Sequence, residues 1–66
     1  MINTALIEEL RIERKLTQED IAHKLGYANK TAYNKKINNK GSSFTVEDIA
    51  MLCQILQVEP NDLILY

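Results

Sequence analysis

A helix-start pattern that occurs twice constrains the fold of this chain more than any other feature. Thr17 and Thr45 are each followed three positions later by an aspartate, and each lies between two apolar residues spaced to meet across a helix start. A threonine cap with an acid at the third helical position forms a capping box, and the apolar pair forms a hydrophobic staple. We therefore expect a helix after each threonine. The first should run to Leu25 and stop at Gly26, which suits a left-handed residue.

Three more helices are predicted around these two. Asn3 can cap a first helix with an apolar face, and Pro60 suits the first position of a short last helix. Another helix is expected between Gly26 and Thr45. No segment shows the sustained alternation of a strand. The sequence therefore predicts an all-α fold of five helices with short connections, in one domain over residues 1–66.

Composition excludes several functional classes. The chain has 66 residues and one cysteine, Cys53, which forbids an internal disulfide and fits a reducing cytosol. It has no apolar run of about 20 residues and no signal-peptide start. It also lacks a glycine-rich phosphate loop, a catalytic triad set and a cluster of metal ligands. We expect no enzyme activity, no cofactor, no metal, no small-molecule ligand and no membrane contact. We expect Cys53 to fill the core, His23 to face solvent, and the protein to act in the cytosol.

The charged residues are unevenly distributed although the net charge is only −1. Residues 28–40 carry four lysines and no acid, whereas residues 41–66 carry four acids and no base. A polar helix with a basic outer face can enter the major groove of DNA, where phosphates attract it and its side chains pair with base edges. A solvated lysine face is the alternative interpretation of the same segment.

The cost of burying charge fixes the register of this basic helix. A start directly after Ala28 would turn two lysines inward, at a cost of several kcal/mol each. A start capped by Asn29 instead turns Tyr33 and Ile37 inward as an i,i+4 pair. Lys36 then lies at the flank, where its stem can cover apolar surface while its ammonium reaches water. We adopt the second register and expect Asn39 or Gly41 to supply the left-handed residue at the helix end.

Residues 10–26 strongly resemble the opening of the Cro/phage-repressor-like family, also called XRE-type. The later stretches around residues 44–49, 56–58 and 62–64 are similar to that family's fourth and fifth helices. The resemblance covers residues 6–64 and implies a lambda-repressor-like domain whose second and third helices form a helix-turn-helix. Residues 35–38 resemble a subgroup common in phages and mobile elements of Gram-positive bacteria. The most specific residues are Leu16, Thr17, Gln18, Ala22, Leu25 and Gly26.

The resemblance implies roles for individual side chains. Gln18 matches a residue that grips a DNA phosphate, and Asn29 is expected to touch phosphate as the cap of the third helix. The helix that follows should read base edges in the major groove. The expected base contacts are Lys30, Thr31, Asn34 and Lys35, and further phosphate contacts are expected from Lys40, Ser42 and Ser43.

Three departures from the family pattern stand out. The turn over residues 26–29 is one residue longer than the family's usual turn. The alignment of the family's third helix with this sequence can therefore be shifted by one residue. The glutamate that the family often pairs with Arg11 is missing, because no acid occurs between residues 21 and 46. Gln57 and Asn39 stand where the family often has glycine.

Two functions remain open at this point. The first is a sequence-specific transcriptional regulator, a phage- or mobile-element-type repressor that binds a palindromic operator in double-stranded DNA as a homodimer. The second is an antitoxin or antirepressor-type protein-interaction module on the same fold. Met51 and Ile55 are either peripheral core or part of a subunit contact. The candidate dimer surface comprises Met51, Ile55, Ile64, Leu65 and Tyr66.

Overall fold

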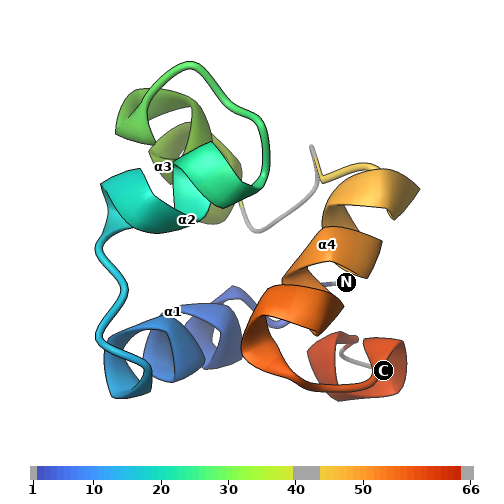
Figure 1. The fold of residues 1–66 in the computed structure, drawn as a ribbon. Helices are drawn as coiled ribbons and strands as arrows, with labels where there is room; N and C mark the ends of the chain where they lie inside the picture. The colour runs from blue at the N-terminus through green and yellow to red at the C-terminus, as the bar shows by residue number, and fades with distance from the viewer. Residues whose placement is uncertain (1, 40–43, 65–66) are drawn as a thin grey trace.

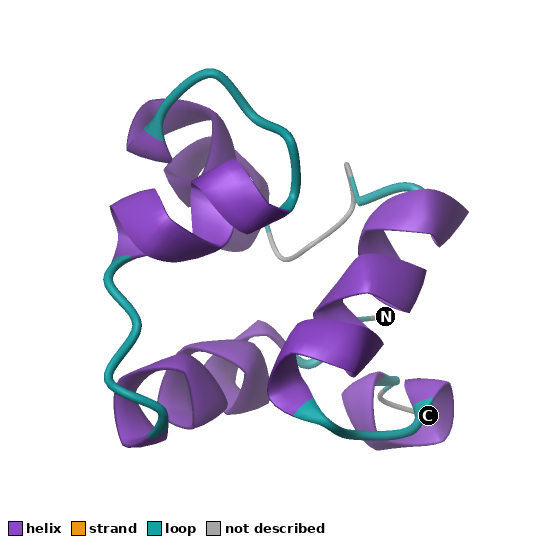
Figure 2. Ribbon diagram, viewed as in Figure 1, coloured by secondary structure: helices purple, strands orange, loops and turns teal. Residues whose placement is uncertain are grey.

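The computed structural model describes residues 2–39 and 44–64, and this part of the chain folds into four α-helices and one 3₁₀ turn. The elements are α1 (Thr4–Glu13), α2 (Gln18–Lys24), α3 (Lys30–Asn38), α4 (Val46–Leu56) and η1 (Pro60–Leu63). The all-α prediction is confirmed, and Figure 2 shows helices and loops only over the described residues. The fifth predicted helix is present at its expected place, but its four residues adopt 3₁₀ geometry, which short pieces tolerate.

The predicted caps form as expected. The hydroxyl of Thr17 accepts a hydrogen bond from the backbone N–H of Asp20, and the Asp20 carboxylate accepts one from the N–H of Thr17. Thr45 and Asp48 make the same reciprocal pair at the start of α4. Each pair satisfies two backbone donors that a helix start leaves free. Asn3 caps α1 through its side chain.

Left-handed residues stand at the ends of three helices, and the first is Lys15 after α1, with φ 59°. Gly26 follows the last residues of α2 with φ +84°, as predicted. Gln57 closes α4 with φ 58° and ψ 49°, at the position where a glycine would be unstrained. Of the two residues expected to be left-handed after α3, Asn39 is not, because its φ of −91° and ψ of 28° keep it in the right-handed half of the backbone map. The alternative, Gly41, lies outside the described residues.

The helices enclose one shared core. In Figure 1, α2 and α3 lie together at one end of the molecule, α1 and η1 lie at the other, and α4 runs along the side. The two ends of the described chain meet at an isolated antiparallel bridge between Ile2 and Ile64. Fully buried residues come from every element, and they are Ile7, Ile21, Ala22, Tyr33, Leu52, Leu56 and Leu63.

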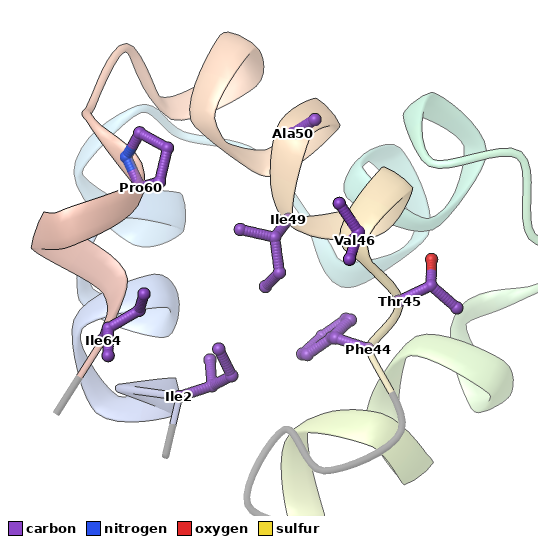
Figure 3. A pocket seen from close by; sticks show the side chains of 8 residues that line it. All are labelled: Ile2, Phe44, Thr45, Val46, Ile49, Ala50, Pro60 and Ile64. Carbon is purple, nitrogen blue, oxygen red and sulfur yellow. The ribbon is translucent and has the colours of Figure 1, made fainter.

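An apolar groove opens beside the start of α4. It has a volume of about 320 Å³, and Figure 3 shows Phe44, Ile49, Ile2 and Ile64 pointing toward one another within it. Val46 stands at its edge with 83 % of its surface exposed. The groove therefore lies where the two ends of the described chain meet α4.

Candidate nucleic-acid interface

The outer face of α3 is polar and exposed. Asn29 starts the helix by accepting a hydrogen bond from the N–H of Ala32 at 3.2 Å, so the predicted register is confirmed. Tyr33 is fully buried and Ile37 packs against the core. Thr31 and Lys35 are exposed on the opposite side. The core therefore holds one side of α3 and leaves the other side open to a ligand.

Lys36 lies at the flank of α3 and serves packing. Its ammonium lies 5.2 Å from the ring centroid of Tyr27 and 5.9 Å from that of Phe44, within the range of a cation–π interaction. The same nitrogen lies 3.4 Å from the Asp48 carboxylate. Burial alone would raise the pKa of Asp48, but the hydrogen bond from the Thr45 backbone N–H, the proximity of Tyr27, and the hydrogen bond and charge of Lys36 lower it below its ordinary value. Lys36 is therefore a structural lysine, as its flank position predicted.

The predicted base contacts share the outer arc of α3. Successive residues turn about 100° around a helix, so Thr31, Asn34 and Lys35 fall within about one third of its circumference. Lys30 is exposed at the edge of this arc. Asn38, one turn after Asn34, is exposed in the middle of the arc and was not among the predicted base contacts. Its outward position follows from the adopted register, which was the available signal.

A hydrogen-bonded carboxylate in α1 supports this face from behind. Oε2 of Glu8 accepts hydrogen bonds from Arg11 Nε at 2.8 Å and from the hydroxyl of Tyr33 at 2.7 Å. Its Oε1 accepts from Arg11 Nη2 at 3.2 Å and from Gln18 Nε2 at 3.1 Å. Burial alone would raise the pKa of Glu8, but these donors outweigh it and lower the pKa below its ordinary value. Glu8 therefore joins α1, α2 and α3 through one ionised group.

Arg11 obtains its acidic partner from its own helix. Glu8 lies three residues before it, and Nη1 of Arg11 also donates to the carbonyl of Leu16 at 2.6 Å. The third helix contributes the hydroxyl of Tyr33 to this cluster where the family often contributes a glutamate. Sequence analysis did not single out Glu8, although its i,i+3 spacing to Arg11 is a recognised ion-pair spacing.

The amide of Gln18 connects this cluster to the outer face of α3. Its Oε1 accepts a hydrogen bond from Asn34 Nδ2 at 3.0 Å, and Oδ1 of Asn34 accepts one from Asn38 Nδ2 at 2.6 Å. Gln18 was predicted to contact phosphate, and it lies half-buried at the first position of α2. An unbroken series of hydrogen bonds thus runs from Asn38 to Glu8.

The remaining predicted contacts are placed unevenly. Asn29 is exposed at the start of α3, whereas Lys40, Ser42 and Ser43 lie outside the described residues. Met51 is 39 % exposed and Ile55 is half-buried against the core. Met51 and Val46 are five residues apart and so lie about 140° apart around α4. Met51 and Ile55 therefore lie on a different side of α4 from the groove that Ile64 lines. Leu65 and Tyr66 lie outside the described residues.

Other reactive side chains give no competing site in the described part of the chain. His23 is exposed and lies 3.5 Å from Glu19 one turn away. Cys53 is half-buried, and burial raises the pKa of its thiol, which makes it a poor nucleophile. Residues 2–39 and 44–64 contain no group of acids, histidines and cysteines arranged to hold a metal ion. Within the same ranges, no helix has the length and apolar character needed to cross a bilayer.

The fold and the exposed face of α3 define a helix-turn-helix protein, in which α2 and α3 pack across the turn at Gly26. Comparison with protein families gives the same class. Residues 7–66 match the family described as the Cro/C1-type HTH DNA-binding domain, and the chain belongs to it. The resemblance seen in the sequence is thereby confirmed. Searches of curated proteins and of solved structures returned no match.

Proposed function

We propose that this DNA-binding domain is a sequence-specific transcriptional regulator, a repressor of the phage or mobile-element type that acts as a homodimer on a palindromic operator. In this proposal, α3 enters the major groove. Lys30, Thr31, Asn34 and Lys35 read bases, and Gln18, Asn29, Lys40, Ser42 and Ser43 contact phosphates. The protein acts in the bacterial cytosol, on the nucleoid, without a cofactor or catalytic activity.

The observation that carries this proposal is the exposed outer face of α3. The lysines there meet no acid on their own segment, because residues 21–46 contain none. Lysine pairs with guanine O6 and N7, asparagine pairs with adenine N6 and N7, and the threonine methyl packs on the thymine methyl. Each such contact discriminates by about 1–3 kcal/mol, so several must act together, and a dimer doubles them.

Dimerisation is supported by exposed apolar surface on α4 and at its neighbours. The groove around Phe44, Ile49 and Ile64 and the separate exposed side chain of Met51 are two faces that a second copy could cover. A symmetric pair would place its two α3 helices about 34 Å apart, one turn of DNA. The operator would then consist of two inverted half-sites at that spacing.

Selection of bound sequences from a random DNA pool tests the proposal directly. We expect one enriched motif with two inverted half-sites. Four to eight phosphate contacts per dimer predict a slope of about −4 to −7 for log affinity against log salt. A pool that gives no enriched sequence, together with a flat salt plot, would contradict DNA recognition by this chain.

The apolar groove also favours the second candidate function, an antitoxin or antirepressor-type interaction module. In that case a protein partner, and not operator DNA, is the main ligand. A toxin gene next to the coding sequence would favour this function, whereas a divergent promoter beside a larger repressor gene would favour the first. Alanine at Val46 and Ile49 should then abolish partner binding and leave DNA affinity unchanged.

A further inference from the structure

We infer that Glu8 is a positioning residue for base reading, because it sets the direction in which the side-chain amides of Gln18 and Asn34 face. This inference rests on the proposed function, since it assigns a specificity role to a residue that lies behind the reading face. Glu8 is on α1, 26 residues before Asn34 in the sequence, and only the amide of Gln18 stands between them.

The direction of the series follows from donor and acceptor chemistry. An ionised carboxylate can only accept hydrogen bonds, so Gln18 must turn its Nε2 toward Glu8. The Oε1 of Gln18 then faces Asn34, which must donate a hydrogen bond to it from Nδ2. The Oδ1 of Asn34 consequently turns toward Asn38. Every amide in the series therefore has one orientation, and that orientation originates at Glu8.

The carboxylate end of the series is held firmly. Arg11 and Tyr33 donate three of the four hydrogen bonds to Glu8, from two different helices. The side chains of Arg11 and Glu8 are only 13 % and 24 % exposed, so water competes weakly with these bonds. The direction set at Glu8 is thus built into the folded domain before any DNA is bound.

The orientation of Asn34 decides what it can offer to a base. An asparagine amide has two N–H donors and two acceptor lone pairs, and the series occupies one of each. One donor and one acceptor remain, in a fixed order along the groove. Adenine requires a donor opposite N7 and an acceptor opposite N6. Reversal of the amide would exchange the two positions and remove the match.

A charge-neutral substitution at this site should reverse the series. In Glu8→Gln the new amide oxygen can take the position of Oε2 and accept from Arg11 Nε and Tyr33, with loss of the bond from Arg11 Nη2 to Oε1, and its N–H groups then face Gln18. Gln18 must turn its oxygen toward residue 8 and its Nε2 toward Asn34, which reverses Asn34 in turn. Glu9→Gln is the matched control, because it removes the same charge from the exposed neighbouring position on α1.

The test compares the base preference of these variants by selection from a random DNA pool. Asn34→Ala first identifies the operator position that Asn34 reads. We expect Glu8→Gln to lose about 5- to 150-fold of discrimination at that position and to keep its preferences elsewhere, while Glu9→Gln behaves as wild type. The double variant Glu8→Gln/Gln18→Glu has the wild-type charge and again presents an acceptor to Asn34. It should recover the wild-type preference at that position, even if overall affinity falls.

Two results separate the failure of this inference from that of the proposed function. If wild-type protein enriches no sequence, the proposed function is wrong. If wild type enriches a motif and folded Glu8→Gln enriches the same base with the same ratio, the positioning role is wrong. Loss of preference at all positions equally, without recovery in the double variant, would also overturn it.

A measurement on the unmodified protein covers the case in which Glu8→Gln fails to fold. In an NMR pH titration, the side-chain amide signals of Gln18 and Asn34 should shift together with the carboxyl carbon of Glu8. The amide of Gln54, exposed on α4, is the control and should not follow that titration. Asn34 signals that stay constant while Glu8 titrates would overturn the inference.

Discussion

The hydroxyl of Tyr33 donates a 2.7 Å hydrogen bond to the carboxylate of Glu8, and this bond joins the proposed reading helix α3 to α1. Hydrogen bonds to charged groups stabilise a protein by about 1.5–3 kcal/mol. Tyr33→Phe should lower the free energy of unfolding by that amount, as measured by urea denaturation. The ring stays in the core in this variant, so the loss reports on the hydroxyl alone.

Tyr27 provides the matched substitution. Its hydroxyl is buried and makes no hydrogen bond of acceptable geometry with any residue that the structure describes, although Asp48 is near enough to help raise its pKa, after burial. A buried polar group without a partner destabilises the fold, so Tyr27→Phe should leave the stability unchanged or raise it by up to about 1 kcal/mol. Equal losses in the two variants would contradict the Glu8–Tyr33 bond.

The stability of the domain should fall in acid, and two of the carboxylates responsible, Glu8 and Asp48, lie at least partly buried, whereas Asp20, whose pKa is also lowered, is exposed. The pKa values of Glu8 and Asp48 lie below their ordinary values of 4.5 and 3.8 in the folded protein. At pH values between the folded and the ordinary pKa values, the unfolded chain therefore binds more protons than the folded protein. The stability that the ionised carboxylates contribute is present above about pH 4.5 and is lost as the pH falls through their pKa values in the folded protein. Thermal melting between pH 7 and pH 3 measures this loss. Asp48→Asn should flatten the acid limb, and an unchanged limb would exclude Asp48 as a source.

Lys35 and Lys36 are neighbours with separate expected roles. Lys36→Ala removes contacts with Tyr27, Phe44 and Asp48, and it should cost about 1 kcal/mol of stability. Lys35→Ala alters an exposed position and should change stability by less than about 0.5 kcal/mol, while it weakens binding to the selected operator. Chemical denaturation and gel-shift titration of both variants check the pair. If Lys35→Ala bound DNA as well as wild type, its assignment as a base contact would be wrong.

The end of α4 offers a stabilising substitution. Gln57 has φ 58°, a conformation that costs a residue with a Cβ about 1 kcal/mol and costs glycine little. Gln57→Gly should therefore raise the melting temperature, corresponding to about 0.5–1 kcal/mol. Gln54→Gly, inside the same helix, should lower the stability by about 1 kcal/mol. A loss of stability in both variants would contradict the left-handed cap.

Local chemistry explains what the sequence could predict. Capping boxes, the glycine after α2 and the inward register of α3 all depend on residues within one or two turns of each other, and all were confirmed. The flank position of Lys36 followed from the same register. The 3₁₀ geometry of η1 was not predicted, because a four-residue segment gives no period from which to choose a helix type. Asn39 or Gly41 was expected to be left-handed, and Asn39 is not, since the preference of asparagine for that conformation is weak.

The contacts that the sequence could not give are those between distant segments. Glu8 contacts Gln18 and Tyr33 only after three helices have packed, and the sequence spacing of these residues does not predict the contacts. The split of the predicted dimer surface between two sides of α4 is likewise a product of tertiary packing. The exposure of side chains on α3 could be predicted, whereas the hydrogen bonds that link α3 to Glu8 could not.

On the outer face of α3, Asn34 is hydrogen-bonded to other side chains, whereas Thr31 and Lys35 are exposed. This difference has a consequence for how such a protein changes its target in evolution. If Thr31 and Lys35 read bases as proposed, substitutions at these exposed positions retarget the protein at little cost to folding. Asn34 is bonded into a series that ends at a shared carboxylate, so a change there disturbs its neighbours as well. Descendants of this chain should diversify first at Thr31 and Lys35 and retain Asn34 until Gln18 or Glu8 has changed.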